Sequence, residues 1–200
     1  MKKILVLLMF IFSSYDIFAQ NHIEFMGIPL GQELRMFIFK LEQKGFKGDE
    51  LLNTFGARMR KESKAGDYNW YTMNGMFMGV KNQSIGIHFT DNNIVNIVAV
   101  SYHYKSWNSA YNQYSKIKSM LTQKYGKPNK SVETFPNPIP KDDRGKIKAI
   151  QTKKGKYAST YNVKSGNIEI SILCIDDNEP YVDLRYKDSS VKERKPIDDL

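Results

Sequence analysis

The stretch SIGIHFTDNNIVNIVAVSYHY, residues 84–104, indicates the fold more strongly than any other part of the chain. On both sides of its DNN segment (91–93), apolar residues alternate with polar or small ones, as in strands that bury one face. Asp and Asn are favoured in tight turns because they tolerate a left-handed backbone and bond their own main chain. The stretch therefore predicts an antiparallel hairpin with strands near 84–90 and 94–104.

A helix is predicted directly after this hairpin. Ser106 is a typical N-cap residue, and Gly126 and Pro128 are typical stop signals. Between them, five residues recur at helical spacing and would face the sheet: Trp107, Tyr111, Tyr114, Ile117 and Leu121. Three more strands are expected after the helix, near 157–163, 167–175 and 181–187.

The beginning of the chain shows the same order of elements. Behind the Gly-Pro-Gly turn of GIPLG (27–31), a helix is predicted over about 32–44, and Gly45 stands where a C-cap glycine belongs. Four of its residues would face the sheet: Leu34, Phe37, Ile38 and Leu41. A strand near 71–81 is expected before the hairpin, and a strand over 22–27 is expected to add an edge.

The two halves can be aligned, because SIGIHFTDNN (84–93) and NIEISILCIDDN (167–178) are both alternating strands that run into an Asp/Asn turn. The predicted fold class is α+β, with two α-β-β-β repeats, over about 22–104 and 105–187, forming an antiparallel sheet with helices packed on one face. One helix barely covers a three-stranded sheet, so two joined units bury their apolar faces better. A single domain would span 20–187, followed by a polar C-terminal tail, 188–200.

The first residues, MKKILVLLMFIFSSYDIFAQ, have the pattern of a secretory signal peptide over 1–19, with cleavage near Ala19. The apolar run from Ile4 to Phe12 is about half the roughly 20 residues that a membrane-spanning helix needs, so no transmembrane segment is expected. The mature chain would be exported, whether periplasmic, at the cell surface or secreted. Loss of two lysines and one aspartate changes the formal charge from +9 to +8, which favours anionic partners.

Three motifs stand out along the chain: FMGIPL (25–30), NGMFMGV (74–80) and AYNQYSKIKSMLTQKYGKP (110–128). Together they resemble a recurrent pattern among uncharacterised secreted proteins of Bacteroidetes with two helix-plus-three-strand repeats. The resemblance implies an exported location and assigns no activity. The order of elements is also similar to that of β-lactamase inhibitor proteins and small envelope assembly proteins, which are binders.

No metal or cofactor is expected. A metal site needs two or three converging ligands, and the chain has three histidines, His22, His88 and His103. The predicted hairpin sets His88 opposite Asn96 and leaves His103 on the other face, roughly 20 Å along the strand.

No catalytic residue is assigned either. Cys174 is the single cysteine, so it cannot form a disulfide within the chain, and its phase with Ile168, Ile170 and Ile172 predicts a small core residue. Burial among apolar residues would raise the pKa of the thiol and block access to it.

Paired carboxylates leave one enzymatic alternative open. Asp142–Asp143, Asp176–Asp177 and Asp198–Asp199 are each typical of a turn or a tail, where aspartate bonds the local backbone. Two carboxylates facing one substrate would instead support a hydrolase acting on envelope or dietary glycans or peptides.

The segment FPNPIPKDDRGKIKAIQTKKGK, residues 135–156, is predicted to be a basic connection in which three prolines oppose a helix at its start. As a mobile loop it would engage an anionic envelope component or an acidic protein; the alternative is a solvated hairpin, or a loop whose lysines serve solubility. Nucleic acid is a poorer candidate, because no aromatic residues are interleaved. The candidate residues are Lys141, Arg144, Lys146, Lys148, Lys153, Lys154 and Lys156.

A second candidate surface is aromatic and consists of Tyr68, Trp70 and Tyr71, which precede the first confident strand. Taken together, the sequence favours a non-catalytic binding module that uses the basic loop and the sheet face left uncovered by the helices. The carboxylate-dependent hydrolase remains the alternative, and a purely structural role cannot be separated from binding by sequence.

Overall fold

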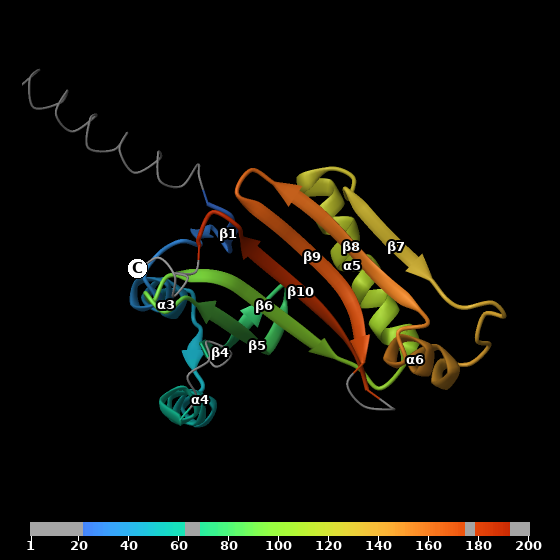
Figure 1. The fold of residues 1–200 in the computed structure, drawn as a ribbon, viewed down its shortest axis with the longest axis horizontal. Helices are drawn as coiled ribbons and strands as arrows, with labels where there is room; N and C mark the ends of the chain where they lie inside the picture. The colour runs from blue at the N-terminus through green and yellow to red at the C-terminus, as the bar shows by residue number, and fades with distance from the viewer. Residues whose placement is uncertain (1–21, 63–68, 175–178, 193–200) are drawn as a thin grey trace, which may run out of the picture.

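The computed structural model describes residues 22–62, 69–174 and 179–192 (Figure 1). The predicted signal peptide lies outside these ranges, as do several residues named above: Tyr68, Asp176, Asp177, Asp198 and Asp199.

The predicted α+β class is confirmed: the described residues form four α-helices and an antiparallel eight-stranded sheet. The strand order is β3-β4-β5-β6-β10-β9-β8-β7, so β6 and β10 join the two halves at the centre (Figure 1). The strands are β3 (Lys47–Gly48), β4 (Trp70–Phe77), β5 (Val80–Phe89), β6 (Val95–His103), β7 (Lys130–Thr134), β8 (Lys156–Val163), β9 (Gly166–Cys174) and β10 (Pro180–Asp188).

The β5–β6 hairpin closes around DNN as predicted, with Asn93 in the left-handed region at φ 60°. The predicted register set His88 opposite Asn96 and was one residue out at this position. In the structure His88 pairs with Ile97, and Phe89 pairs with Val95. Asn96 is thus the extra residue of a β-bulge, a feature that the apolar alternation does not reveal.

The predicted strand 71–81 was too long. β4 ends at Phe77, which pairs with Val80 across a two-residue turn. Met78 and Gly79 in this turn have φ of 48° and 79°, as a type I′ hairpin turn requires. Methionine rarely adopts this conformation, so the turn has no recognisable signal in the sequence.

The prediction of an edge strand over 22–27 was wrong. β1 (Glu24–Phe25) and β2 (Ile28–Pro29) pair with each other in a separate two-stranded hairpin. This hairpin packs against the core through Phe25. The centroid of the Phe25 ring lies 5.0 Å from that of Phe77, on which it stacks, and 5.3 Å from that of Tyr186, which it meets edge-on.

Both predicted helices are present, as α3 (Leu34–Gln43) and α5 (Trp107–Tyr125). On α3, Phe37 and Leu41 are fully buried. On α5, the Ser106 hydroxyl accepts a hydrogen bond from the Ser109 amide at 3.2 Å, which confirms the N-cap. Tyr111 was expected in the core but is exposed.

Two further helices were not predicted. α6 (Asp143–Gln151) lies inside the predicted basic loop and buries Ile147 and Ile150 in the core. α4 (Glu50–Glu62) runs beside the outer edge of β4. There the side-chain amide of Asn53 accepts a hydrogen bond from the backbone N–H of Thr72 at 2.7 Å and donates one to the backbone carbonyl of Thr72 at 3.0 Å. The amide of Asn53 therefore continues the strand pairing that β3 begins.

α3, α5 and α6 bury their apolar residues in one core, on one face of the sheet. The opposite face, here called the open face, carries small and polar side chains, such as the row Thr72, Gly86 and Ala99. Leu52 of α4 reaches this side, so the prediction that helices pack on one face does not extend to α4. Among the described residues no helix is both long and apolar enough to cross a membrane.

Candidate functional site

The open face contains a hollow of about 380 Å³ at the junction of the two halves of the sheet. We call it the open-face hollow. Its lining comes from four adjacent strands and from α4: Leu52, Trp70, Thr72, Ser84, Gly86, Ala99, Ser101, His103, Tyr181, Asp183 and Arg185.

One wall is formed by Trp70, whose position depends on a glycine. A Cβ atom on Gly86 would stand 3.1 Å from Trp70 Cε3, so the six-membered ring of the indole lies over this residue. The ring also meets His88 edge-on, with centroids 5.1 Å apart. Glycine at 86 therefore lets the indole lie close to the sheet beside the hollow.

The other wall is a stacked pair, because the rings of His103 and Tyr181 are 5.3 Å apart and 18° from parallel. Burial raises the pKa of the Tyr181 phenol above its ordinary value, and the negative charge of Asp183 adds to the effect. The phenol is thus protonated at neutral pH and can donate a hydrogen bond.

The floor holds one buried carboxylate, that of Asp183. It accepts hydrogen bonds from Arg185 Nε at 2.5 Å and from the Ser101 hydroxyl at 3.3 Å. The Arg185 side chain is half exposed, so its remaining N–H groups can reach a ligand.

The predicted aromatic surface is only partly brought together. Trp70 faces the open side, whereas Tyr71 packs against the core, since neighbouring residues of a strand point to opposite faces. Sequence reasoning missed Tyr181, Asp183 and Arg185, which are 111 or more positions further along the chain than Trp70 and reach the site because β10 pairs with β6. Their i, i+2, i+4 spacing in YVDLR was the available signal.

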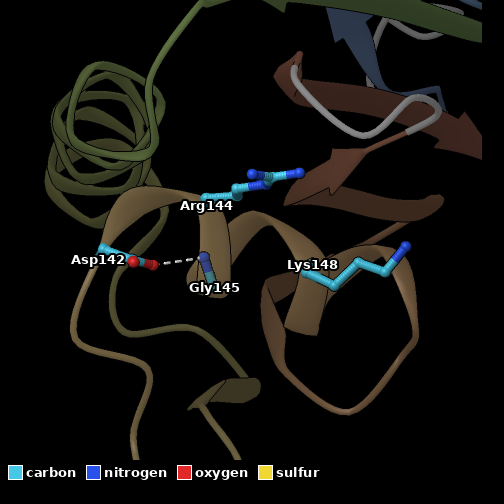
Figure 2. Close-up of a pocket in the computed structure, with 4 residues that line it drawn as sticks. All are labelled: Asp142, Arg144, Gly145 and Lys148. Atoms are coloured by element: carbon cyan, nitrogen blue, oxygen red, sulfur yellow. Dashed lines mark hydrogen bonds between the residues drawn. The ribbon is translucent and has the colours of Figure 1, made fainter.

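The predicted basic residues surround α6 and are here called the basic cluster: Lys141, Arg144, Lys146, Lys148, Lys153, Lys154 and Lys156. Arg144 and Lys148, with Asp142 and Gly145, line a hollow of about 370 Å³. Figure 2 shows both cationic side chains extending from the helix, away from Asp142. The Asp142 carboxylate accepts from the Gly145 amide at 2.7 Å and caps the helix, so it is an N-cap, where the sequence suggested a turn. Six members are exposed, and Lys146 is half-buried.

In the part of the chain that the structure describes, no three His, Cys, Asp or Glu side chains are arranged to hold a metal ion. Each histidine has its own neighbour: His22 Nδ1 is 2.7 Å from Asp188, His88 Nδ1 is 2.6 Å from Asn96, and His103 stacks on Tyr181.

His22, Asp188 and Ser190 form a Ser-His-Asp cluster at the end of β10. The Ser190 hydroxyl lies 3.3 Å from Nδ1 of His22, the same nitrogen that faces Asp188. In a catalytic triad the serine bonds the opposite ring nitrogen, Nε2, so this geometry is not that of a triad. Asp188 is buried in β10, which corrects its assignment to the C-terminal tail.

Cys174 lies at the end of β9 and is half-buried against the core. Its thiol is 3.7 Å from the Glu179 carbonyl. Cys174 therefore faces the core, as predicted, but it is not completely buried.

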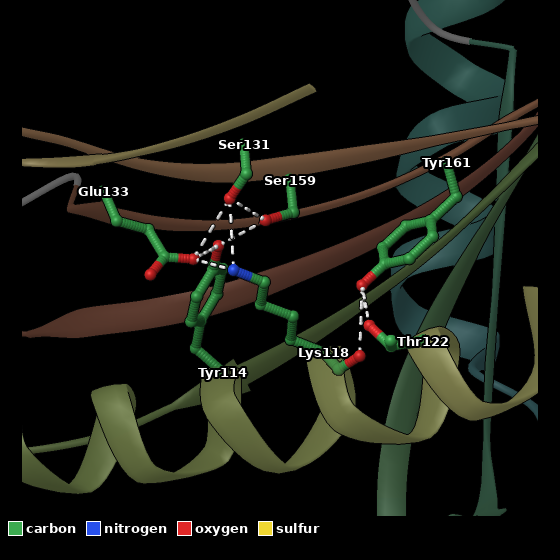
Figure 3. A network of polar contacts seen from close by, with 7 residues as sticks. All are labelled: Tyr114, Lys118, Thr122, Ser131, Glu133, Ser159 and Tyr161. Atoms are coloured by element: carbon green, nitrogen blue, oxygen red, sulfur yellow. Dashed lines mark hydrogen bonds and ion pairs between the residues drawn. The ribbon is translucent and has the colours of Figure 1, made fainter. Parts of the chain in front are cut away.

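A polar network between α5 and the paired strands β7 and β8 was not predicted (Figure 3). The Tyr114 hydroxyl donates to Glu133 at 2.9 Å and lies 2.8 Å from the Ser159 hydroxyl, and Lys118 bonds both Glu133 and Ser131. Burial by itself would raise the pKa of the Glu133 carboxyl, but hydrogen bonds from Lys118 and Tyr114 outweigh it and hold that pKa below its ordinary value. The network therefore stabilises the charged carboxylate.

This network predicts an acid-sensitive contribution to stability. Because the pKa of Glu133 is lowered in the folded protein, its stabilising effect is complete above pH 4.5 and is lost as the pH falls through the lower, folded-state pKa. We expect Glu133→Gln to have a lower melting temperature than wild type near neutral pH, and this difference in melting temperature to disappear in acid. Thermal unfolding between about pH 3 and 7 measures the difference, and a difference that does not change with pH would contradict the prediction.

Each of these hollows contains a single carboxylate among the described residues: Asp183 on the open face, Asp142 beside α6, and Glu133 in a hollow of about 540 Å³ next to α5. Acid/base hydrolysis by a carboxylate pair needs two that face one substrate. None of these three hollows therefore brings together the carboxylate pair that the hydrolase alternative needs.

Comparisons of the chain with protein-family models, with curated proteins and with solved structures found no match. The function is therefore argued from the geometry of the surface.

Proposed function

We propose that this chain is a non-catalytic binding module, and that the open face of its sheet is the binding surface. The observation that carries the proposal is the open-face hollow, where Trp70, Tyr181 and Arg185 surround a floor of small residues. Trp, Tyr and Arg are the residue types that dominate binding energy in interfaces, and Ser and Gly supply adaptable contacts around them.

The groups in the hollow also suit binding better than catalysis. Asp183 is paired with Arg185, and Tyr181 is held in its protonated form. These groups are arranged to donate and accept hydrogen bonds, whereas a general base needs an available lone pair and a pKa near the working pH.

α4 extends the binding surface at its edge. Leu51, Leu52 and Phe55 are 80%, 50% and 60% exposed, and Leu52 lines the open-face hollow. Large apolar side chains exposed on one short helix are typical of an interaction surface.

We further infer that the chain consists of two repeats, each longer than the sequence suggested. The orders α3-β3-α4-β4-β5-β6 and α5-β7-α6-β8-β9-β10 are the same, and in each half the short strand after the first helix forms an outer edge of the sheet. The hollow would then lie where the last strands of the two repeats, β6 and β10, meet.

Export after cleavage near Ala19 belongs to the same proposal. It rests on the lysines and the apolar run of the first residues, and a binding module of the envelope or the medium is consistent with it. Mass spectrometry of the mature N-terminus would test the cleavage site.

The binding surface can be tested by filling the hollow. Ser84 is exposed on β5 and lines it, so Ser84→Arg should block the surface without disturbing the core. Asn112→Arg, at an exposed position of α5, is the matched control. In affinity capture from envelope extract, a component retained by wild type and the control should be lost by Ser84→Arg. Equal capture by all three proteins, or capture by none, would reject the open face as the binding surface.

The basic cluster gives a separate expectation for anionic partners. Changing Lys141, Arg144, Lys153, Lys154 and Lys156 to Gln removes five exposed charges around α6. We expect this variant to leave a column of immobilised dextran sulfate at much lower salt than wild type, because adjacent charges act together on a polyanion. The control removes five scattered, exposed lysines: Lys44, Lys47, Lys81, Lys105 and Lys164. If both variants elute at the same salt concentration, net charge alone governs retention, and the basic cluster is not a binding site for polyanions.

A further inference from the structure

We propose that the open-face hollow binds an uncharged saccharide, one or two sugar rings at a time. This rests on the proposed function, since it takes the open face as the binding surface, and it adds the chemical class of the ligand.

The size of the hollow is appropriate. Its volume of about 380 Å³ lies near the lower end of the range of about 300–1,000 Å³ for small-molecule sites. The floor stays low because Ala99 and Ser101 carry short side chains, and Gly86 leaves room for the Trp70 indole that lies over it.

The walls supply aromatic surfaces on two sides. The indole of Trp70 lies over Gly86 at one side, and the stacked rings of His103 and Tyr181 form the other. A sugar ring carries C–H groups on its faces and hydroxyl groups around its rim. Its C–H faces can pack on aromatic rings, whose faces are electron-rich, while its hydroxyls remain available for hydrogen bonds.

The floor supplies those hydrogen bonds. Thr72 and Ser84 contribute hydroxyl groups that can donate and accept, and the Ser101 hydroxyl, which donates to Asp183, can accept. The buried Asp183 carboxylate holds the Arg185 guanidinium through Nε, so the remaining N–H groups of Arg185 can donate to neighbouring hydroxyls of a sugar. The lining thus offers both donors and acceptors, as a ligand with several hydroxyl groups requires.

Charge argues for a neutral ligand. The formal charges of Asp183 and Arg185 cancel within their ion pair, which leaves the hollow without excess charge from its acidic and basic residues. The basic cluster surrounds α6 and contributes no residue to the lining of this hollow. A phosphate-bearing or carboxylate-bearing polymer would therefore be drawn to α6, and an uncharged glycan to the open face.

Tryptophan fluorescence can report on the hollow directly. The chain has two tryptophans, and Trp107 is buried at 3% exposure, so in Trp107→Phe the emission comes from Trp70 alone. We would titrate this protein and wild type with cellohexaose, chitohexaose and mannohexaose, and with oligogalacturonate as the anionic comparison. Calorimetry on wild type provides a second readout that does not depend on the Trp107 substitution.

We expect at least one uncharged hexasaccharide to change the Trp70 emission saturably, and oligogalacturonate to have no such effect. Ser84→Arg and Trp70→Ala should each weaken this binding at least tenfold in calorimetry, and Asn112→Arg should leave it unchanged. Two variants are used so that the result does not depend on the folding of either.

Absence of saturable binding by all three uncharged sugars in both readouts would overturn the saccharide inference. It would leave the proposed function standing if Ser84→Arg still loses a captured component, which would then be a ligand of another class. Sugar binding that Ser84→Arg and Trp70→Ala do not weaken would also overturn the inference, because it would place the sugar elsewhere.

Discussion

Replacing Phe37 by alanine should lower the free energy of unfolding by about 3 to 5 kcal/mol. The Phe37 ring has no exposed surface and lies in the core on the helical face of the sheet. Its removal loses the burial of an aromatic ring and leaves a cavity that the neighbouring strands cannot close completely. Urea unfolding followed by tryptophan fluorescence measures the loss.

The control for this substitution lies on the same helix. Phe39 is 53% exposed, so Phe39→Ala makes the same chemical change outside the core. It should alter stability by about 0.5 kcal/mol or less. Equal losses in the two variants would show that α3 does not bury the face that its spacing indicates.

The sequence was sufficient for elements whose apolar residues keep one period. On α3, the spacing of Phe37 and Leu41 identified the buried side, and both residues are fully buried. The alternation in 84–104 likewise identified β5 and β6. In each case the signal is strong because the residues that face the core all come from one continuous segment.

Two helices without a long apolar stripe were missed. α4 exposes Leu51, Leu52 and Phe55, so no buried apolar stripe marked it, and the contacts of Asn53 with Thr72 cross 19 residues of sequence. A local pattern does not contain such a distant partner. α6 follows three prolines and is short, and its cap, Asp142, has the same sequence signal as a turn.

The sequence predicted Trp70 and the uncovered sheet face as parts of a binding surface. Tyr181, Asp183 and Arg185 belong to β10, and their approach to Trp70 depends on the sheet order β4-β5-β6-β10, which joins the last strand of each half. Sequence reasoning placed the three strands of each half next to one another and left open how the halves meet. The hollow lies at that junction, so its composition could not be deduced before the strand order was known.

Asp188→Ala should lower the free energy of unfolding by about 2 to 4 kcal/mol, although this position looks like the start of a polar tail. The side chain is completely buried and bonds His22 Nδ1 at 2.7 Å, the Ser190 amide at 2.9 Å and the Ser190 hydroxyl at 2.5 Å. Alanine would remove all three hydrogen bonds to this carboxylate, and bonds to a charged group contribute about 1.5 to 3 kcal/mol each. Water recovers part of this loss, because Ser190 is exposed and the His22 side chain is 23% exposed.

The neighbouring residue provides the comparison. Lys187→Ala removes an exposed side chain from the same strand and should cost about 0.5 kcal/mol or less. Asp188→Asn keeps an oxygen that can accept from the Ser190 amide, so it should fall between the two alanine variants in urea unfolding. Because His22 is 166 positions before Asp188, their contact joins the segment before β1 to the end of β10. If Asp188→Ala were as stable as Lys187→Ala, this contact would contribute nothing, and the domain would end before Asp188, as the polar sequence suggests.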